Sequence, residues 1–340
     1  MLVVFTCLFM LVPAALMAGG FWLLGGWGLL AGLGIALLVV LAITLVFLRH
    51  GIFRKTPRQA GDTLSPGPGE KRTTAGLARQ QRLRNKLLAH GRENLWITSY
   101  DGLRLYGVFV PGAPGEKRVM MILHGYGGNA LQMAEYALYF REHYGFNILL
   151  PDMRCHGQSD GRYLGMGWLE RKDCLQWLAL LEKKLGPGVQ AALYGVSMGG
   201  ATVMMLAGEA LPPWVKFMVE DCGYTSVHDQ FAFQVKSIYH LPPFPIVPLG
   251  SLLCRALAGY GFWEASAVKQ LQKATLPMVF VHGQADTFVP YAMLQTVFEQ
   301  AACQNKVRIA IPGATHAQAF PMDTVGKIKK EIDRYIRLYM

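Results

Sequence analysis

The sequence predicts an α/β fold, a mostly parallel sheet with helices on both faces and a lid insertion, preceded by an N-terminal transmembrane helical hairpin. Two observations lead to this prediction. From about residue 94 onward, short apolar runs ending in glycine or a polar residue alternate with segments of helical character. Such alternation indicates βαβ units. Before that, residues 1–48 contain no Asp, Glu, Lys, Arg or His.

The charge-free N-terminal stretch is long enough for two membrane spans. A helix needs about 20 apolar residues to cross a bilayer, and the run GGFWLLGGWG at residues 19–28 interrupts the stretch. Because Gly and Trp suit a turn at the membrane interface, we expect spans at about 2–23 and 27–48, within a hairpin domain of residues 1–49. The alternative, a cleaved signal peptide followed by one anchor, is less favoured because no basic segment precedes the apolar run.

Residues 50–93 are predicted to form a basic juxtamembrane linker. Between residues 49 and 95 there are eleven Lys or Arg and three Asp or Glu, which accounts for most of the net charge of +11. Basic residues beside a span favour the cytoplasmic side and can contact anionic lipid headgroups. We therefore expect a multi-pass protein of the inner cell membrane with a cytoplasmic C-terminal domain. Nucleic acid is not an expected partner, because the basic run adjoins a span and lacks interleaved aromatic residues.

The basic run also predicts a short helix. Residues 77–92, LARQQRLRNKLLAHGR, place Leu83, Leu87 and Leu88 near one helix face. This segment is interpreted either as a plain solvated helix or as a helix lying on a membrane surface.

The cysteines agree with a cytoplasmic domain. The six cysteines are widely spaced and form no C-x-x-C pair, which argues against zinc-ribbon and thioredoxin-like sites. Unpaired, scattered cysteines are typical of a reducing compartment.

The domain expected at residues 94–340 opens with two strands around a turn at Asp101 and Gly102. The next run, RVMMILHG at residues 118–125, is continuously apolar, which is typical of a strand buried on both faces of a parallel sheet. Five further strands are expected at FNILLPD, VQAALYG, VKFMVED, PMVFVHG and KVRIAIPG. Helices are expected near residues 130–144, 168–185, 198–211, 291–303 and from about 322.

A long break in this alternation, at about residues 222–276, predicts an inserted lid. The break is too long for a plain connection. Its run LPPFPIVPLG argues against a regular helix, because closely spaced prolines remove backbone donors. Ligands of open α/β sheets bind outside the carboxyl ends of the strands, so an insertion that follows a strand end is placed to cover that edge. The alternative is a structural excursion without substrate contact.

Two stretches match the pattern G-x-S-x-G of serine hydrolases. Ser197 lies in YGVSMGG, between an apolar strand and a helical run, whereas Ser159 lies in HGQSDG, with no strand before it and no helix after it. The chemistry requires a sharp strand-to-helix turn that exposes the serine oxygen. We therefore expect Ser197 to be the nucleophile and Ser159 to belong to a tight glycine-flanked loop.

A serine nucleophile needs a base and an acid that orients the base. In this arrangement the chain order is Ser, then Asp or Glu, then His. Asp286 follows the strand PMVFVHG, and His316 follows the strand KVRIAIPG. The sequence thus predicts a Ser197–His316–Asp286 triad, with Asp221 as the fallback acid.

The oxyanion hole needs two backbone N–H groups. The expected donors are Met198, directly after the nucleophile, and Tyr126, in the glycine-rich loop HGYGG. His124 and His282 also end strands, and packed polar roles are favoured for both over catalysis.

Together the motifs HGYGG, PDMRCHGQSDG, YGVSMGG, HGQADTFVP and GATHAQAF resemble the α/β-hydrolase superfamily. Within it, residues 94–340 are most similar to membrane-anchored bacterial hydrolases of the serine aminopeptidase-like and BEM46-like group. The resemblance implies the α/β-hydrolase fold, a serine triad and no metal or organic cofactor. It also implies that the loop from His156 to Ser159 follows the fourth strand. Cys155 departs from the glycine found in many relatives.

The expected activity is that of a membrane-anchored serine hydrolase acting through an acyl-enzyme. The apolar insertion and the adjacent membrane favour an ester or thioester with an apolar, lipid-like acyl group. A serine peptidase of the same fold is the first alternative. A catalytically silent membrane scaffold is the alternative from another class.

Overall fold

The computed structural model describes residues 26–54 and 73–340. The first predicted span, residues 2–23, lies outside the described residues. The chain divides into two compact units, of which one comprises Met1–Phe53 with Val227–Glu264 and the other Arg54–Ser226 with Ala265–Met340. After the roles that the sequence leads us to expect, we call the first the anchor unit and the second the hydrolase unit.

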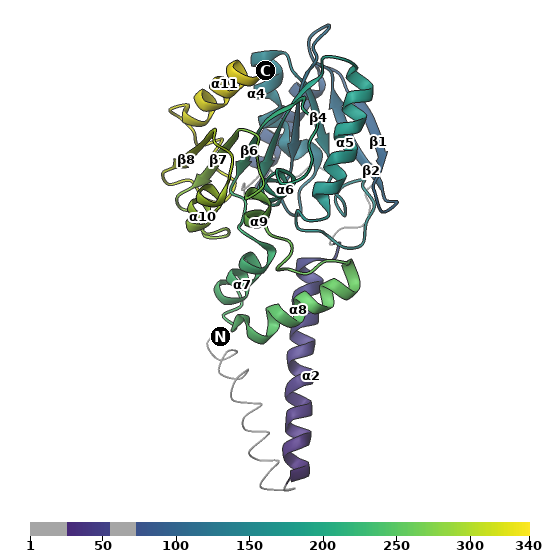
Figure 1. Cartoon of the computed structure of the whole chain (residues 1–340), viewed down its shortest axis with the longest axis vertical. Helices are drawn as coiled ribbons and strands as arrows, with labels where there is room; N and C mark the ends of the chain where they lie inside the picture. The colour runs from purple at the N-terminus through teal and green to yellow at the C-terminus, as the bar shows by residue number, and fades with distance from the viewer. Residues whose placement is uncertain (1–25, 55–72) are drawn as a thin grey trace. The chain divides into compact units, whose positions relative to one another are not determined.

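The hydrolase unit is built on an eight-stranded sheet with the order β1-β2-β4-β3-β5-β6-β7-β8. Only β2 runs antiparallel to its neighbours, and the pairs from β4 to β8 are parallel. The predicted mostly parallel sheet is therefore confirmed (Figure 1). The strands are β1 Glu93–Thr98, β2 Arg104–Val110, β3 Arg118–Leu123, β4 Asn147–Pro151, β5 Gln190–Val196, β6 Val215–Asp221, β7 Met278–Gly283 and β8 Lys306–Ile311.

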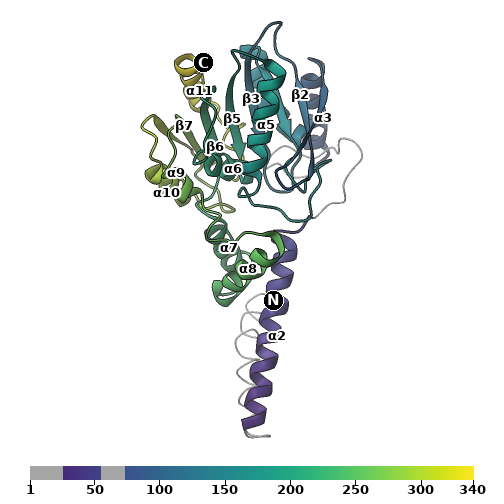
Figure 2. The ribbon, with the colours of Figure 1, turned by 45° about the vertical axis from the view of Figure 1, so that its right-hand side comes forward.

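Helices cover both faces of this sheet. Side chains of α3, α4 and α11 share one apolar core with alternate residues of the strands, such as Val108 and Val110 of β2. The intervening Gly107 faces the other layer, where a β-carbon would lie 2.9 Å from the ring of Trp177 in α5. Figure 2 shows α5 and α6 in front of the sheet. The helices of this unit are α3 Thr74–Leu88, α4 Ala134–Tyr144, α5 Glu170–Leu185, α6 Met198–Leu206, α9 Ala267–Leu271, α10 Ala292–Gln300 and α11 Lys327–Tyr339, with a 3₁₀ turn at Ala130–Met133.

The basic helix α3 directs its apolar side toward the core of the hydrolase unit. Leu87 is fully buried, and Leu83 and Leu88 pack against the core. The amide of Gln80 donates a hydrogen bond of 2.8 Å to the carbonyl oxygen of Leu131. The structure therefore favours neither of the two interpretations of this segment, because its leucines face protein and not solvent or lipid.

The anchor unit contains α2, Gly26–Gly51, together with α7, Val227–Ser237, and α8, Pro243–Ala258. Residues Leu30–Gly51 of α2 are long and apolar enough to cross a membrane, with a mean hydropathy of 2.8. This helix corresponds to the second predicted span, residues 27–48. The hairpin as a whole is not shown, because its first span lies outside the described residues.

The inserted segment contains a helix where the prolines predicted none. That expectation was wrong, because α8 runs through most of LPPFPIVPLG. Phe244 has non-helical dihedrals (φ −89°, ψ 134°), so the regular turns begin after it. Pro245 is then the first residue of the regular turns, where a missing N–H does little harm, and Pro248 follows only three residues later, near the start of the helix. The part of the insertion assigned to the anchor unit, residues 227–264, is also shorter than the predicted lid at 222–276.

Candidate active site

Ser197 occupies a strained turn between β5 and α6. Its backbone has φ 58° and ψ −115°, and a positive φ is uncommon for a residue with a side chain. The turn is possible because its neighbours have no side chains. A β-carbon on Gly195 would lie 2.1 Å from the carbonyl oxygen of Gly199, and one on Gly199 would lie 2.3 Å from that of Leu123. The N–H of Ser197 also donates a 2.7 Å hydrogen bond to the carbonyl oxygen of Asp221 at the end of β6.

The structure brings Ser197, His316 and Asp286 together. The Nε2 atom of His316 lies 2.9 Å from the Oγ atom of Ser197, and its Nδ1 atom lies 2.7 Å from the Oδ2 atom of Asp286. Asp286 follows β7 and His316 follows β8, so the sheet order places both beside the serine turn. This chain of hydrogen bonds has the geometry of a nucleophile, a base and an orienting acid.

The surroundings of Asp286 hold its carboxylate in the charged form. Burial alone would raise its pKa, but hydrogen bonds from His282 and His316 and from the N–H of Val289 bring the pKa well below its ordinary value. The N–H groups of Phe288 and Val289 donate to Oδ1 at 2.9 and 3.0 Å. An ionised carboxylate is the state needed to hold an imidazole in one tautomer.

His282 is a contact of Asp286 that the sequence did not reveal. It is fully buried, and its Nε2 atom lies 3.2 Å from Asp286 Oδ2 and 3.1 Å from the carbonyl oxygen of Val289. The residue is packed, as the sequence leads us to expect, but its partner is the candidate acid of the triad. The four-residue spacing in HGQAD is the signal that could have indicated this contact.

Asp221, the fallback acid, is bonded elsewhere. Its Oδ2 atom accepts a 2.9 Å hydrogen bond from the hydroxyl of Tyr194, and its Oδ1 atom has no hydrogen-bond partner among the residues the structure describes. Burial raises the pKa of Asp221 to about 6, partly offset by the Tyr194 hydroxyl and by His282 and His316. Asp286, which bonds to His316 directly, is therefore the better placed acid.

The second serine motif forms a buried loop instead of a reactive turn. Ser159 is fully buried. Its Oγ atom donates to the carbonyl oxygen of Asp152 at 2.5 Å and accepts from the N–H of Tyr106 at 2.9 Å. Both hydrogen bonds connect the loop to the backbone of neighbouring segments, so this hydroxyl stabilises the fold.

The loop after β3 passes close to Ser197. A β-carbon on Gly125 would lie 3.2 Å from the Cβ atom of Ser197, so the backbone that carries Tyr126 runs beside the serine. Met198 is the first residue of α6 and follows the serine directly. The two predicted oxyanion donors therefore flank Ser197 from two different elements, at a helix N-terminus where backbone N–H groups favour negative charge.

His156, from the loop of the second serine motif, supports this glycine-rich loop. Its Nε2 atom accepts a 3.0 Å hydrogen bond from the N–H of Gly127, so its proton lies on Nδ1, which donates to the carbonyl oxygen of Arg154 at 2.9 Å. His124 is held in the same way. Its Nδ1 atom donates to the carbonyl oxygen of Gly125 at 2.7 Å, and its Nε2 atom accepts from the N–H of Met153 at 3.0 Å. The sequence pattern alone does not indicate this role for either ring.

These two histidines predict a loss of stability in acid. Burial, the main cause, lowers the pKa of His124 to about 3 and that of His156 to about 4. Between about pH 6.5 and 4 these two side chains are therefore protonated in the unfolded chain but not in the native chain, so their contribution to stability falls as the pH falls. Each histidine should contribute a slope of about 1.4 kcal/mol per pH unit. Melting temperatures from pH 7 to pH 4.5 measure the effect.

The matched variant for this test is His156→Gln, whose amide oxygen can still accept from Gly127. Compared with the wild type, this variant should lose less stability, or gain more, as the pH is lowered from 6.5 to 4.5. An unchanged slope would show that His156 takes up no proton on unfolding in this range.

The hydrogen bonds of His316 also bear on the one cluster of potential metal ligands found among the described residues. Ligand atoms of Cys222, Asp286 and His316 lie within 4.8 Å of one another. Both ring nitrogens of His316 are already hydrogen-bonded, to Ser197 and Asp286. A metal here would have to displace one of these bonds, so the donor set fits a triad better than a metal centre.

The comparisons with known proteins support the α/β-hydrolase fold. Residues 114–239 match the family described as serine aminopeptidase, S33. The chain is 28% identical over 219 residues to YqkD of Bacillus subtilis, a protein described as uncharacterized, with 63% of this chain and 71% of YqkD covered.

Solved structures show the same fold. The esterase Pf2001 of Pyrococcus furiosus is similar with a TM-score of 0.62 and 19% identity, and the likeness covers 84% of this chain and 100% of the esterase. An acylaminoacyl peptidase of Pyrococcus horikoshii is similar with a TM-score of 0.51 and 13% identity over 72% of this chain and 40% of the peptidase. The chain thus shares its fold with an esterase and with a peptidase.

Proposed function

We propose that the protein is a membrane-anchored serine hydrolase that cleaves a carboxylic ester or thioester through an acyl-enzyme. The single observation that carries this proposal is the hydrogen-bonded series from Ser197 through His316 to Asp286, at 2.9 and 2.7 Å. A serine turn of this geometry, with an ionised acid behind the imidazole, is the arrangement that activates a hydroxyl for acyl transfer.

In the proposed reaction, Ser197 Oγ attacks the substrate carbonyl carbon while His316 Nε2 takes the hydroxyl proton. The N–H groups of Tyr126 and Met198 stabilise the oxygen on which negative charge develops. His316 then gives the proton to the departing alcohol or thiol, leaving Ser197 acylated. In the second half, His316 removes a proton from water, which attacks the acyl carbonyl, and then returns that proton to Ser197 Oγ as the acyl group departs as a carboxylic acid. Asp286 stabilises the imidazolium throughout.

The acyl specificity is tested with p-nitrophenyl esters of increasing chain length, run beside aminoacyl anilides. We expect turnover of the esters, because the anchor suits an apolar substrate, and little turnover of the anilides. The alternative, a serine peptidase, is favoured by the match to the serine aminopeptidase family. Preference for the anilides would select it.

A catalytically silent scaffold is tested separately. A fluorophosphonate probe should label the wild-type chain at Ser197, because the probe needs an activated serine and no particular substrate. Absence of labelling, under conditions that label a known serine hydrolase, would refute the proposed enzyme.

The proposed anchor is α2, whose residues Leu30–Gly51 are apolar and long enough to cross a bilayer. The two-span hairpin and the cytoplasmic hydrolase unit stay predictions from the sequence. Protease added to intact right-side-out cells should spare a cytoplasmic hydrolase unit, and its digestion would reverse the orientation.

A further inference from the structure

Helix α8 of the insertion is apolar over most of its surface. Its buried side consists of Ile246, Val247, Gly250, Ser251 and Cys254. Most of its remaining surface is apolar as well, with Phe244 75% exposed and Leu252 65% exposed. The one charged residue of the helix, Arg255, is paired with Glu264. Helices that are apolar all round are found within protein cores or in lipid.

This helix is too short to cross a membrane. Its 16 residues correspond to roughly 24 Å at 1.5 Å per residue, whereas the hydrocarbon core of a bilayer is about 30 Å thick. Its exposed side chains also exclude a place wholly inside the anchor unit. An apolar helix of this length, partly uncovered, has the properties of a re-entrant or interfacial segment.

The same helix is packed directly on α2. A β-carbon on Gly250 would lie 3.6 Å from side-chain atoms of both Thr44 and Leu48. At this position α8 therefore lies in direct packing contact with α2. Thr44 is fully buried and bonds its own hydroxyl to the carbonyl oxygen of Val40 at 2.8 Å, so its hydroxyl group is satisfied without water.

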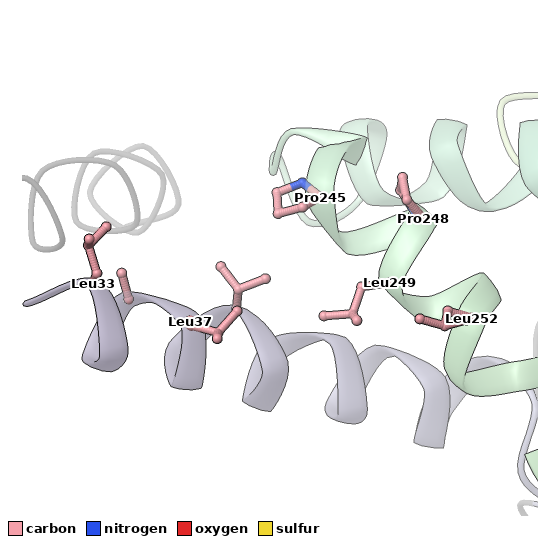
Figure 3. A pocket seen from close by; sticks show the side chains of 8 residues that line it. Leu33, Leu37, Pro245, Pro248, Leu249 and Leu252 are labelled. Carbon is pink, nitrogen blue, oxygen red and sulfur yellow. The ribbon is translucent and has the colours of Figure 1, made fainter. Parts of the chain in front are cut away.

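A groove of about 570 Å³ opens between α2 and α8 (Figure 3). All of its side chains are hydrocarbon. They are Leu33, Ala36, Leu37 and Val40 of α2 and Pro245, Pro248, Leu249 and Leu252 of α8. The four α2 residues lie within Leu30–Gly51, the stretch that can span a membrane. When α2 crosses the bilayer, the groove is therefore at the depth of the hydrocarbon core.

We propose that α8 enters the bilayer as a re-entrant helix and that the groove between α2 and α8 binds an acyl chain of a phospholipid. The proposal rests on the membrane anchor of the proposed function and not on its chemistry. The occupant is lipid because no polar side chain lines the groove, and because the large exposed side chains beside it, such as Leu37, Leu38 and Leu252, are apolar.

The test places the photo-crosslinking residue p-benzoylphenylalanine at three exposed leucines, one at a time, in the full-length chain. Leu252 lines the groove, and Leu38 lies on α2 outside the groove. Leu338 is the matched control, because it is 59% exposed on α11 of the hydrolase unit. Each variant is reconstituted into vesicles of palmitoyl-oleoyl-phosphatidylcholine, irradiated and analysed by mass spectrometry.

We expect a phosphatidylcholine adduct at Leu38 and at Leu252 and none at Leu338. An adduct at Leu38 alone would leave the anchor in place and overturn the lipid groove. A cross-link from Leu252 to residues 1–25 would also overturn it, because the chain itself would then fill the groove. Absence of adducts at both Leu38 and Leu252 would also contradict the proposal that α2 crosses the membrane. The ester assay above is independent of all three outcomes.

Discussion

Replacing Ser197 with Ala should lower kcat for a p-nitrophenyl ester on the order of 10⁶-fold, as removal of a triad serine does elsewhere. The hydroxyl supplies the oxygen that forms the acyl-enzyme, and it is the group that lies 2.9 Å from the imidazole of His316. The variant should fold, because the backbone of the turn is held by the N–H bond to Asp221 and by the flanking glycines, not by the hydroxyl. Initial rates and fluorophosphonate labelling measure the loss.

Ser159→Ala is the matched control for this variant. The substitution removes the hydrogen bonds to Asp152 and Tyr106, which should destabilise the hydrolase unit by about 1–3 kcal/mol. The folded enzyme should keep its kcat and its labelling. Labelling that survives Ser197→Ala and disappears in Ser159→Ala would mean that Ser159 is the nucleophile.

The second large effect is expected at Asp286. Asp286→Asn should lower kcat about 10⁴-fold, because an amide in place of the carboxylate favours the wrong imidazole tautomer and cannot stabilise the imidazolium. The position is buried and receives four hydrogen-bond contacts, from His282, His316, Phe288 and Val289. The pH dependence of kcat/KM measures the accompanying change in the basicity of the imidazole.

Asp221→Asn is the matched comparison at the end of the neighbouring strand. This carboxyl bonds to Tyr194 and not to His316, so its conversion to the amide should alter kcat far less than the change at Asp286. Equal losses in the two variants would mean that both carboxyls act on the imidazole. A larger loss at Asp221 would reverse the assignment of the acid.

The meeting of Ser197, Asp286 and His316 could be predicted from sequence because each follows a parallel strand, and parallel strands end at one edge of the sheet. Helix boundaries are harder to predict from the sequence. The last helix was expected from about residue 322 but begins at Lys327, because the carboxylate of Asp323 accepts hydrogen bonds from the N–H groups of Lys327 and Ile328 at 2.8 Å. The helix after Ser197 ends at Leu206 and not near residue 211, since an apolar pattern can continue beyond the last hydrogen-bonded turn.

Other features of the structure correspond to no local pattern in the sequence. The insertion belongs to one compact unit with α2, and contacts between segments so far apart in the chain do not appear in the periodicity of either. The supporting roles of His156 and His282 depend in the same way on which backbone or carboxyl group a buried ring meets. The prolines of α8 did not prevent a helix because their effect depends on position, being mild in a first turn and severe in the middle of a helix.

The packing at Gly195 and Gly199 also has a consequence for how this protein can change. Because a single added methyl group at either position would collide with backbone at 2.1 or 2.3 Å, random mutagenesis should recover almost no active substitutions there. Libraries aimed at new substrates would therefore be better directed to positions whose side chains have room to vary. Laboratory evolution should therefore leave the residues of the serine turn unchanged and vary the positions around it.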